Sequence, residues 1–124
     1  MTVVLVVDDD ERNRKLACDV LSAAGFDTLE ATTGIDAIAM ATEIAPDVIL
    51  MDLRLPDMSG VEACLRLRGD RRTVEIPVVA MSAMRLEGSG DWLEAAGFAG
   101  CIDKPIQIRA FPDQVRRYCS DAAR

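Results

Sequence analysis

The sequence contains no histidine among its 124 residues. Histidine is the commonest general base and the commonest transition-metal ligand of proteins, so both roles must fall to other side chains. Its absence also excludes phosphohistidine chemistry within this chain. Any chemistry here must therefore use carboxylates, hydroxyl groups and lysine.

Long hydrophobic runs and paired cysteine motifs are also absent. The longest early apolar run, Val3 to Val7, is too short to cross a bilayer and lacks the basic flank and cleavage site of a secretory signal. No C-x-x-C pair occurs, which disfavours a zinc site or a redox dithiol. The cysteines are Cys18, Cys64, Cys101 and Cys119, and we expect each to be a small buried apolar residue. We expect a cytoplasmic protein with no membrane contact.

The sequence has no low-complexity tract and no linker rich in proline, glycine or serine. With 50% hydrophobic and 28% charged residues, it is typical of a folded chain rather than a disordered one. We expect residues 1–124 to form one domain, with no output domain. The net charge of -7 disfavours direct nucleic-acid binding, because that affinity comes from clustered lysine and arginine.

Short β-branched runs alternate five times with longer amphipathic stretches, a pattern typical of βα units around a parallel sheet. The predicted strands are Val3–Val7, Asp27–Glu30, Val48–Met51, Pro77–Met81 and Gly100–Ile102. Three of them are almost wholly apolar, which predicts helices on both faces of the sheet. We expect a flavodoxin-like, doubly wound α/β fold of the (βα)5 type, with a parallel five-stranded sheet of order 2-1-3-4-5.

Local patterns predict which helix residues are buried and where helices begin and end. The apolar stripes are Leu16, Ala17, Val20, Leu21 and Ala24 in the first helix, and Phe111, Val115, Tyr118 and Cys119 in the last. We expect both stripes in the core. Ala-Ala-Gly-Phe occurs at residues 23–26 and 95–98, and Gly followed by an apolar residue is typical of a helix end. We interpret Asp10 as a helix N-cap rather than a metal ligand.

Polar residues follow the predicted strands where the chain leaves the sheet. They are Asp8 and Asp9 after the first strand, Asp52 after the third, Ser82 after the fourth, and Asp103 and Lys104 after the fifth. In an open α/β sheet the ligand crevice lies outside the carboxyl ends of the strands, where the strand order reverses. The first and third strands are neighbours there, so Asp8, Asp9 and Asp52 are expected to meet.

Three converging carboxylates repel one another unless a positive charge joins them. Oxygen ligands without histidine or thiolate suit Mg²⁺, with Mn²⁺ as an alternative, better than zinc. Lys104 would add a second positive charge, and Ser82 a hydroxyl donor. A carboxylate nucleophile, a metal, an ammonium and a hydroxyl are the parts needed to neutralise a phosphoryl group during transfer.

Four segments, in this order and at these spacings, resemble the motifs of the response-regulator receiver domain of two-component signalling, in its chemotaxis-regulator-like form. They are Val-Val-Asp-Asp-Asp at residues 6–10, Asp-Leu-Arg-Leu-Pro-Asp-Met-Ser-Gly at 52–60, Met-Ser-Ala at 81–83 and Lys-Pro at 104–105. The resemblance covers essentially the whole chain. It implies that Asp52 is the phosphoacceptor. The implied Mg²⁺ ligands are Asp9 directly, Asp8 through water, Asp52, and the backbone carbonyl of Arg54.

The resemblance further implies that the hydroxyl of Ser82 moves to bond the phosphoryl oxygens and that Lys104 binds the phosphoryl group. It implies a cis peptide bond between Lys104 and Pro105. The phosphoryl donor would be a histidine kinase, a histidine phosphotransfer protein or a small phosphodonor. Phosphorylation would switch the surface of helix four, strand five and helix five toward a downstream target or an attached output domain. Such a module promotes its own Mg²⁺-dependent phosphorylation and dephosphorylation and is not a turnover enzyme.

Three positions depart from the receiver pattern or modify it. Receivers usually carry Tyr or Phe three residues before the lysine, where this chain has Cys101, so the usual aromatic switch is missing. The nearest candidates to replace it are Met84 and Phe98. Arg54 and Met84 occupy positions that flank the path of a hydrolytic water, and we hypothesise that these two side chains change the lifetime of the phosphorylated state.

Three other functions compete with the receiver interpretation. An aspartate-nucleophile phosphohydrolase generally needs an Asp two residues after the nucleophile, where this chain has Arg54. A flavin-binding module on the same fold would need a phosphate loop rich in Ser, Thr or Gly after the first strand. A degenerate receiver, retained only for protein interaction, is disfavoured by the complete acidic site and favoured by Cys101.

Overall fold

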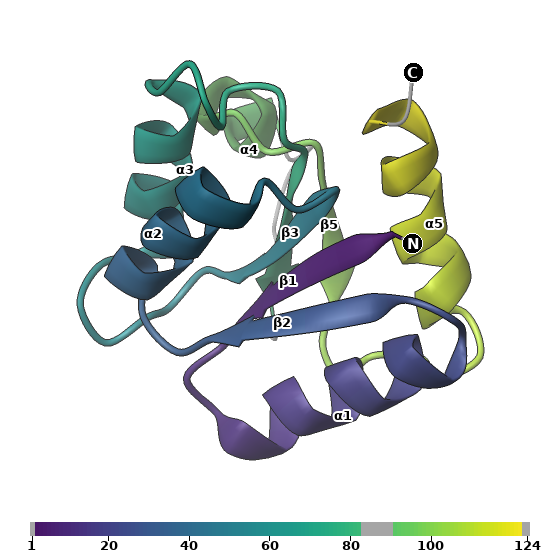
Figure 1. The fold of residues 1–124 in the computed structure, drawn as a ribbon. Coiled ribbons are helices and arrows are strands. Elements are labelled where there is room, and N and C mark those ends of the chain that lie inside the picture. Colours follow the sequence, from purple (N-terminus) through teal and green to yellow (C-terminus); the bar gives the residue numbers. More distant parts are fainter. Residues whose placement is uncertain (1, 83–90, 123–124) are drawn as a thin grey trace.

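The computed structural model describes residues 2–82 and 91–122, in which five strands alternate with five helices (Figure 1). The strands are β1 (Val3–Val7), β2 (Asp27–Ala31), β3 (Val48–Asp52), β4 (Val78–Ser82) and β5 (Gly100–Asp103). The helices are α1 (Glu11–Ala23), α2 (Gly34–Ile44), α3 (Gly60–Arg68), α4 (Asp91–Ala96) and α5 (Phe111–Ala122). All paired strands are parallel and their order is β2-β1-β3-β4-β5, which confirms the predicted fold.

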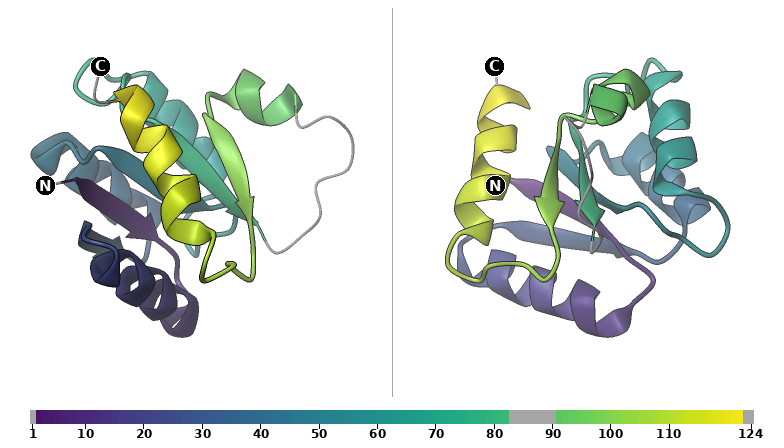
Figure 2. Two further views of the ribbon diagram at one scale, coloured as in Figure 1. Left: turned by 90° about the vertical axis from the view of Figure 1, so that its right-hand side faces the viewer. Right: turned by 180° about the vertical axis from the view of Figure 1, so that it is seen from behind.

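Helices cover both faces of the sheet, as the apolar strands require (Figure 2). α1 and α5 pack on one face, where Leu21 and Phe111 join Val4 and Leu50. α2, α3 and α4 pack on the other face. Within the described residues, every helix is too short or too polar to span a membrane.

The buried residues of α1 and α5 match the predicted stripes with one clear exception. Ala17 and Leu21 are buried, but Leu16 is 39% exposed. At 3.6 residues per turn, Leu16 lies about 100° around the helix from Ala17, at the border of the buried face. Its assignment to the core was therefore wrong. Phe111 of α5 is fully buried, and Tyr118 is partly buried against the same core.

The predicted helix ends are confirmed. The Asp10 carboxylate accepts hydrogen bonds from the backbone N–H groups of Arg12 and Asn13, so it caps α1. Gly25 and Gly97 have positive φ values of 96° and 101°, which glycine adopts without the steric penalty that other residues meet. In both copies of the tetrapeptide, the next phenylalanine N–H donates back to a carbonyl of the preceding helix, over 3.0 Å.

The two ends of the described chain lie on the side of the sheet away from the carboxyl ends of the strands (Figure 1). The backbone N–H of Val3 donates to Asp47, which precedes β3, over 2.7 Å. Burial raises the pKa of the Cys119 thiol to about 11, and the nearby charge of Asp47 adds to this rise. Late α5 therefore lies near the beginning of β1 and β3.

Candidate functional site

Three acidic side chains meet at the carboxyl ends of β1 and β3. Val7 and Met51 are register partners on these neighbouring strands, so the residues that follow them leave the sheet side by side. One carboxylate oxygen from each of Asp8, Asp9 and Asp52 lies within 4.8 Å of the other two. Asp8 is only 4% exposed, Asp52 is partly buried and Asp9 is exposed. The expected convergence of the three carboxylates is therefore present.

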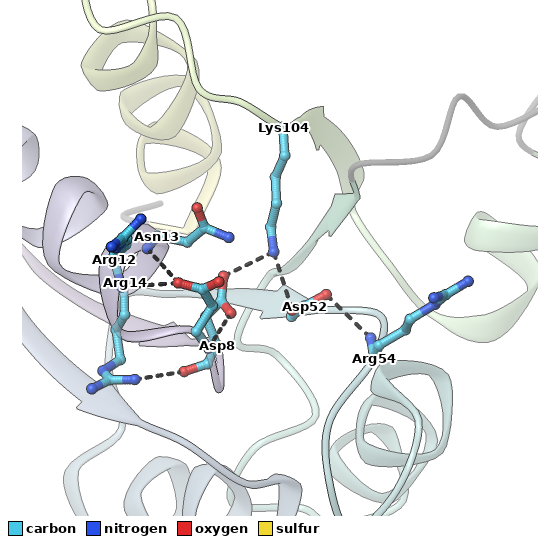
Figure 3. Close-up of polar contacts among 8 residues, drawn as sticks. Asp8, Arg12, Asn13, Arg14, Asp52, Arg54 and Lys104 are labelled. Atoms are coloured by element: carbon cyan, nitrogen blue, oxygen red, sulfur yellow. Dashed lines mark hydrogen bonds and ion pairs between the residues drawn. The ribbon is translucent and has the colours of Figure 1, made fainter.

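Lys104, which follows β5, lies between two of these carboxylates (Figure 3). Its Nζ atom is 2.8 Å from Asp8 Oδ2 and 3.1 Å from Asp52 Oδ2. Burial on its own lowers the pKa of Lys104, but the hydrogen bonds to Asp8 and Asp52, together with their charges, outweigh burial and raise it. The ammonium group therefore stays charged and neutralises part of the acidic cluster.

Main-chain N–H groups hold the remaining oxygens of these carboxylates. Asp8 Oδ1 accepts a hydrogen bond from the N–H of Asp10 over 2.9 Å, and Asp52 Oδ1 accepts one from the N–H of Arg54 over 3.1 Å (Figure 3). Each carboxylate thus has one oxygen toward Lys104 and one toward the backbone, which fixes its orientation. The second contact also brings the backbone of residue 54 next to Asp52.

Ser82 ends β4 directly beside this cluster. It follows Met81, the register partner of Asp52, and is 6% exposed. Its carbonyl accepts a hydrogen bond from the N–H of Lys104 over 2.8 Å, and this bond joins the carboxyl end of β4 to the residue that follows β5. The peptide bond between Lys104 and Pro105 is cis, as the resemblance implied.

The position three residues before the lysine is less closely tied to the site. Cys101 pairs in register with Ala80 and is partly buried, and burial raises the pKa of its thiol. Of the two candidates to replace an aromatic switch, Phe98 is 3% exposed in the core under α3 and α4. Met84 lies outside the described residues. Tyr118 packs so closely on β5 that a side chain at Gly100 would overlap its ring.

Sequence reasoning missed Arg14. Its Nη1 atom donates to the backbone carbonyl of Asp8 over 2.9 Å, and its Nε atom forms an ion pair with Glu30 over 2.9 Å. Arg14 therefore ties α1 to the ends of β1 and β2. The available signal is its spacing: it lies one helical turn after the N-cap Asp10, on the side that faces back toward β1.

The acidic cluster fits a hard divalent cation. Ligands around an octahedral Mg²⁺ lie about 2.0–2.1 Å from the ion, so opposite ligand atoms are roughly 4 Å apart. The 4.8 Å spread of the three oxygens is close to that span. The three carboxylates and the single ammonium of Lys104 leave two negative charges uncompensated, which a divalent cation would balance. The site offers only oxygen ligands, which is the donor set that Mg²⁺ prefers.

Comparison with known proteins is consistent with this geometry. The sequence profile of the family described as the response regulator receiver domain matches residues 4–116. The polar-differentiation response regulators DivK of Brucella ovis and Brucella suis are 36% identical over 119 residues, which cover 96% of this chain and 97% of each relative.

Two solved structures are similar throughout. Chemotaxis protein CheY4 of Vibrio cholerae gives a TM-score of 0.88 at 26% identity, over 95% of this chain and 98% of that one. The receiver domain of the sensor histidine kinase PA1611 from Pseudomonas aeruginosa gives a TM-score of 0.87 at 26% identity, over 96% of this chain and 98% of that one. The second structure has a magnesium ion coordinated in its active site cleft.

Proposed function

The chain belongs to the response regulator receiver family of two-component signalling, and from this premise we propose that it accepts a phosphoryl group on Asp52 in a reaction that requires Mg²⁺. The observation that carries the proposal is the position of the Asp52 carboxylate. It lies at the end of a buried strand, beside two further carboxylates and 3.1 Å from the Lys104 ammonium. A carboxylate so placed combines a nucleophilic oxygen with positive charge for the incoming phosphate.

The surrounding residues have distinct roles in the proposal. Asp8, Asp9, Asp52 and the backbone carbonyl of Arg54 would hold Mg²⁺. When bound, Mg²⁺ neutralises charge on the transferring phosphoryl group. An oxygen of Asp52 forms a bond to phosphorus while the bond between phosphorus and the donor breaks, and the donor keeps that bond's electron pair.

Two other residues act on the phosphoryl group once it is on Asp52. The Lys104 ammonium, already between Asp8 and Asp52, pairs with a phosphoryl oxygen. The Ser82 hydroxyl donates to another one, from the buried end of β4. Both contacts are charge-assisted hydrogen bonds, which are stronger than neutral ones.

The donor and the output lie outside the chain. Because residues 1–124 contain no histidine, a phosphohistidine donor lies outside them, on a histidine kinase or a phosphotransfer protein. The acyl phosphate then shifts the surface formed by α4, β5 and α5, which binds a downstream protein or an attached domain. Trp92 of α4, 44% exposed, is an apolar contact available to such a partner. In this proposal residues 1–124 are a receiver domain alone.

Intact-protein mass spectrometry after incubation with acetyl phosphate tests this function. We expect a gain of one phosphoryl group that requires Mg²⁺ and is lost when EDTA is added before the donor. Borohydride reduction followed by peptide mapping would locate the acyl phosphate at residue 52. A phosphoryl group on any other residue would contradict the proposal, as would no gain from acetyl phosphate and none from a phosphorylated histidine kinase.

Replacing Arg54 with alanine is expected to shorten the half-life of the phosphorylated chain several-fold. Arg54 follows the phosphoacceptor by two residues and is exposed, and the hypothesis is that its long side chain would restrict the approach of water to the acyl phosphate. The measurement is loss of the phosphoryl mass with time after removal of the donor. Arg12→Ala, which removes an exposed arginine from α1, is the matched control. Equal half-lives for Arg54→Ala and the wild type would contradict the hypothesis.

A further inference from the structure

The loop between β3 and α3 is fastened to the beginning of α2 by the side chain of Asp57. Its Oδ1 atom accepts a hydrogen bond from the N–H of Gly34 over 2.8 Å, and its Oδ2 atom accepts one from the N–H of Ile35 over 2.9 Å. Asp57 and Gly34 are 23 residues apart in sequence. A single carboxylate therefore binds two N–H groups of the first turn of another element.

A second contact lies beside the first. Met58 packs on Gly34 so closely that a Cβ atom at residue 34 would lie 2.5 Å from Met58 Cγ and 2.7 Å from its Sδ atom. Gly34 is itself buried, and α2 packs on the sheet through Ala37 and Ala41. The tip of the loop is therefore fixed to a helix that is already anchored in the core.

The end of the same loop, at Gly60, packs against the backbone of Asp52. Gly60 donates its N–H to the carbonyl of Leu53 over 2.9 Å, and Arg54 and Ser59 form an isolated antiparallel bridge. A Cβ atom at Gly60 would overlap the backbone carbonyl of Asp52. The loop is thus closed on itself and begins where the Arg54 N–H holds Asp52 Oδ1. Movement of its tip would move the backbone of residue 54.

Capping of α2 does not by itself account for Asp57. Thr33 is the N-cap residue of this helix, and its Oγ1 atom accepts a hydrogen bond from the N–H of Asp36 over 3.0 Å. The helix therefore has a local cap of the usual kind. The hydrogen bonds from Gly34 and Ile35 lower the pKa of the Asp57 carboxyl, so Asp57 is ionised at neutral pH and interacts favourably with the helix N-terminus.

We infer that Asp57 is a positioning residue for the acidic site: by fixing residues 53–60 to α2, it sets the backbone of Arg54 beside Asp52 and so strengthens Mg²⁺ binding. This inference rests on the proposed function, because it takes Mg²⁺ as the ligand of the site. Residues that orient metal ligands from outside the coordination shell typically change metal affinity by about 10–100-fold. Asp57 acts through several bonds of the loop, so we expect the lower end of that range.

Isothermal titration of Mg²⁺ into the wild type, Asp57→Ala and Thr33→Ala tests the inference. Thr33→Ala is the matched control, because it weakens the same end of α2 without releasing the loop. We expect Asp57→Ala to weaken Mg²⁺ binding about tenfold, and Thr33→Ala to leave it within about twofold of wild type. Asp57→Asn, which keeps the shape and one acceptor oxygen, is expected to fall between them and serves if Asp57→Ala does not fold.

Several outcomes would overturn the inference. Equal Mg²⁺ affinity in Asp57→Ala and Thr33→Ala would reduce Asp57 to a second helix cap, and so would a loss of affinity that simply follows the loss of thermal stability in both variants. No Mg²⁺ binding by the wild type would overturn it as well. If Mg²⁺ binding weakens as expected while no donor phosphorylates the wild type, the positioning role stands and the proposed function fails.

Discussion

A chain carrying Asp52→Asn is expected to gain no phosphoryl group from acetyl phosphate or from a phosphorylated histidine kinase. The amide has the shape of the carboxylate but no anionic oxygen, so the nucleophile is lost. The amide oxygen can still accept a hydrogen bond from Lys104 or from the N–H of Arg54, and we therefore expect the fold to be retained. Intact mass with and without Mg²⁺ gives the yield, and circular dichroism checks the fold.

The matched control for this variant is Asp103→Asn. Asp103 ends β5 directly before Lys104 and is exposed, so the substitution removes the same charge at the same edge of the sheet. We expect it to be phosphorylated at close to the wild-type rate. Equal phosphorylation of Asp52→Asn and the wild type would contradict the assignment of the phosphoacceptor. Loss of phosphorylation in both variants would attribute the effect to local charge instead.

The second large effect is expected from Lys104→Met. Removing a positive charge that faces the developing charge of a transferred group typically costs about 10²–10³ in rate. In the absence of Mg²⁺, the variant also leaves the buried carboxylate of Asp8 without its ammonium partner. Removing one partner of such a buried pair costs about 3–5 kcal/mol of stability. Because Mg²⁺ supplies the missing positive charge, it should stabilise this variant more than the wild type.

Two measurements check this prediction. The first is the initial rate of phosphorylation by acetyl phosphate at saturating Mg²⁺. The second is the midpoint of urea unfolding with and without Mg²⁺. Lys15→Met, on the exposed face of α1, is the control and is expected to change neither quantity appreciably. A Lys104→Met chain as stable as wild type without Mg²⁺ would show that the ion pairs add little to the fold.

The fold was predictable from the sequence because three of its strands are almost wholly apolar. Runs such as Val3–Val7 carry no polar residue, so they must be covered on both faces, and each observed strand agrees with its predicted limits to within one residue. The convergence of Asp8, Asp9 and Asp52 followed from topology alone, since parallel neighbouring strands end together. The prediction failed for Leu16, where the border of a helix face depends on packing that periodicity does not describe.

The supporting contacts of the site were not predictable in the same way. Asp57 lies in the loop between β3 and α3, yet its carboxylate binds the N–H groups of Gly34 and Ile35 in another part of the chain. Arg14 is one of two arginines early in α1, and its residue type does not show that it binds the carbonyl of Asp8. Contacts of this kind join loops that are close only after the sheet has formed. Residue type and spacing therefore carry little information about them.

The location of the chain ends has a practical consequence. The start of β1 and the end of α5 lie on the side of the sheet away from the carboxyl end of β3 (Figure 1), so an affinity tag, a fluorophore or a surface attachment at either place leaves the acidic site open to donors. The same geometry suits circular permutation, in which a linker joins the two ends and new ends are made elsewhere. Such a linker would pass neither over the carboxylate cluster nor over the loop that Asp57 holds.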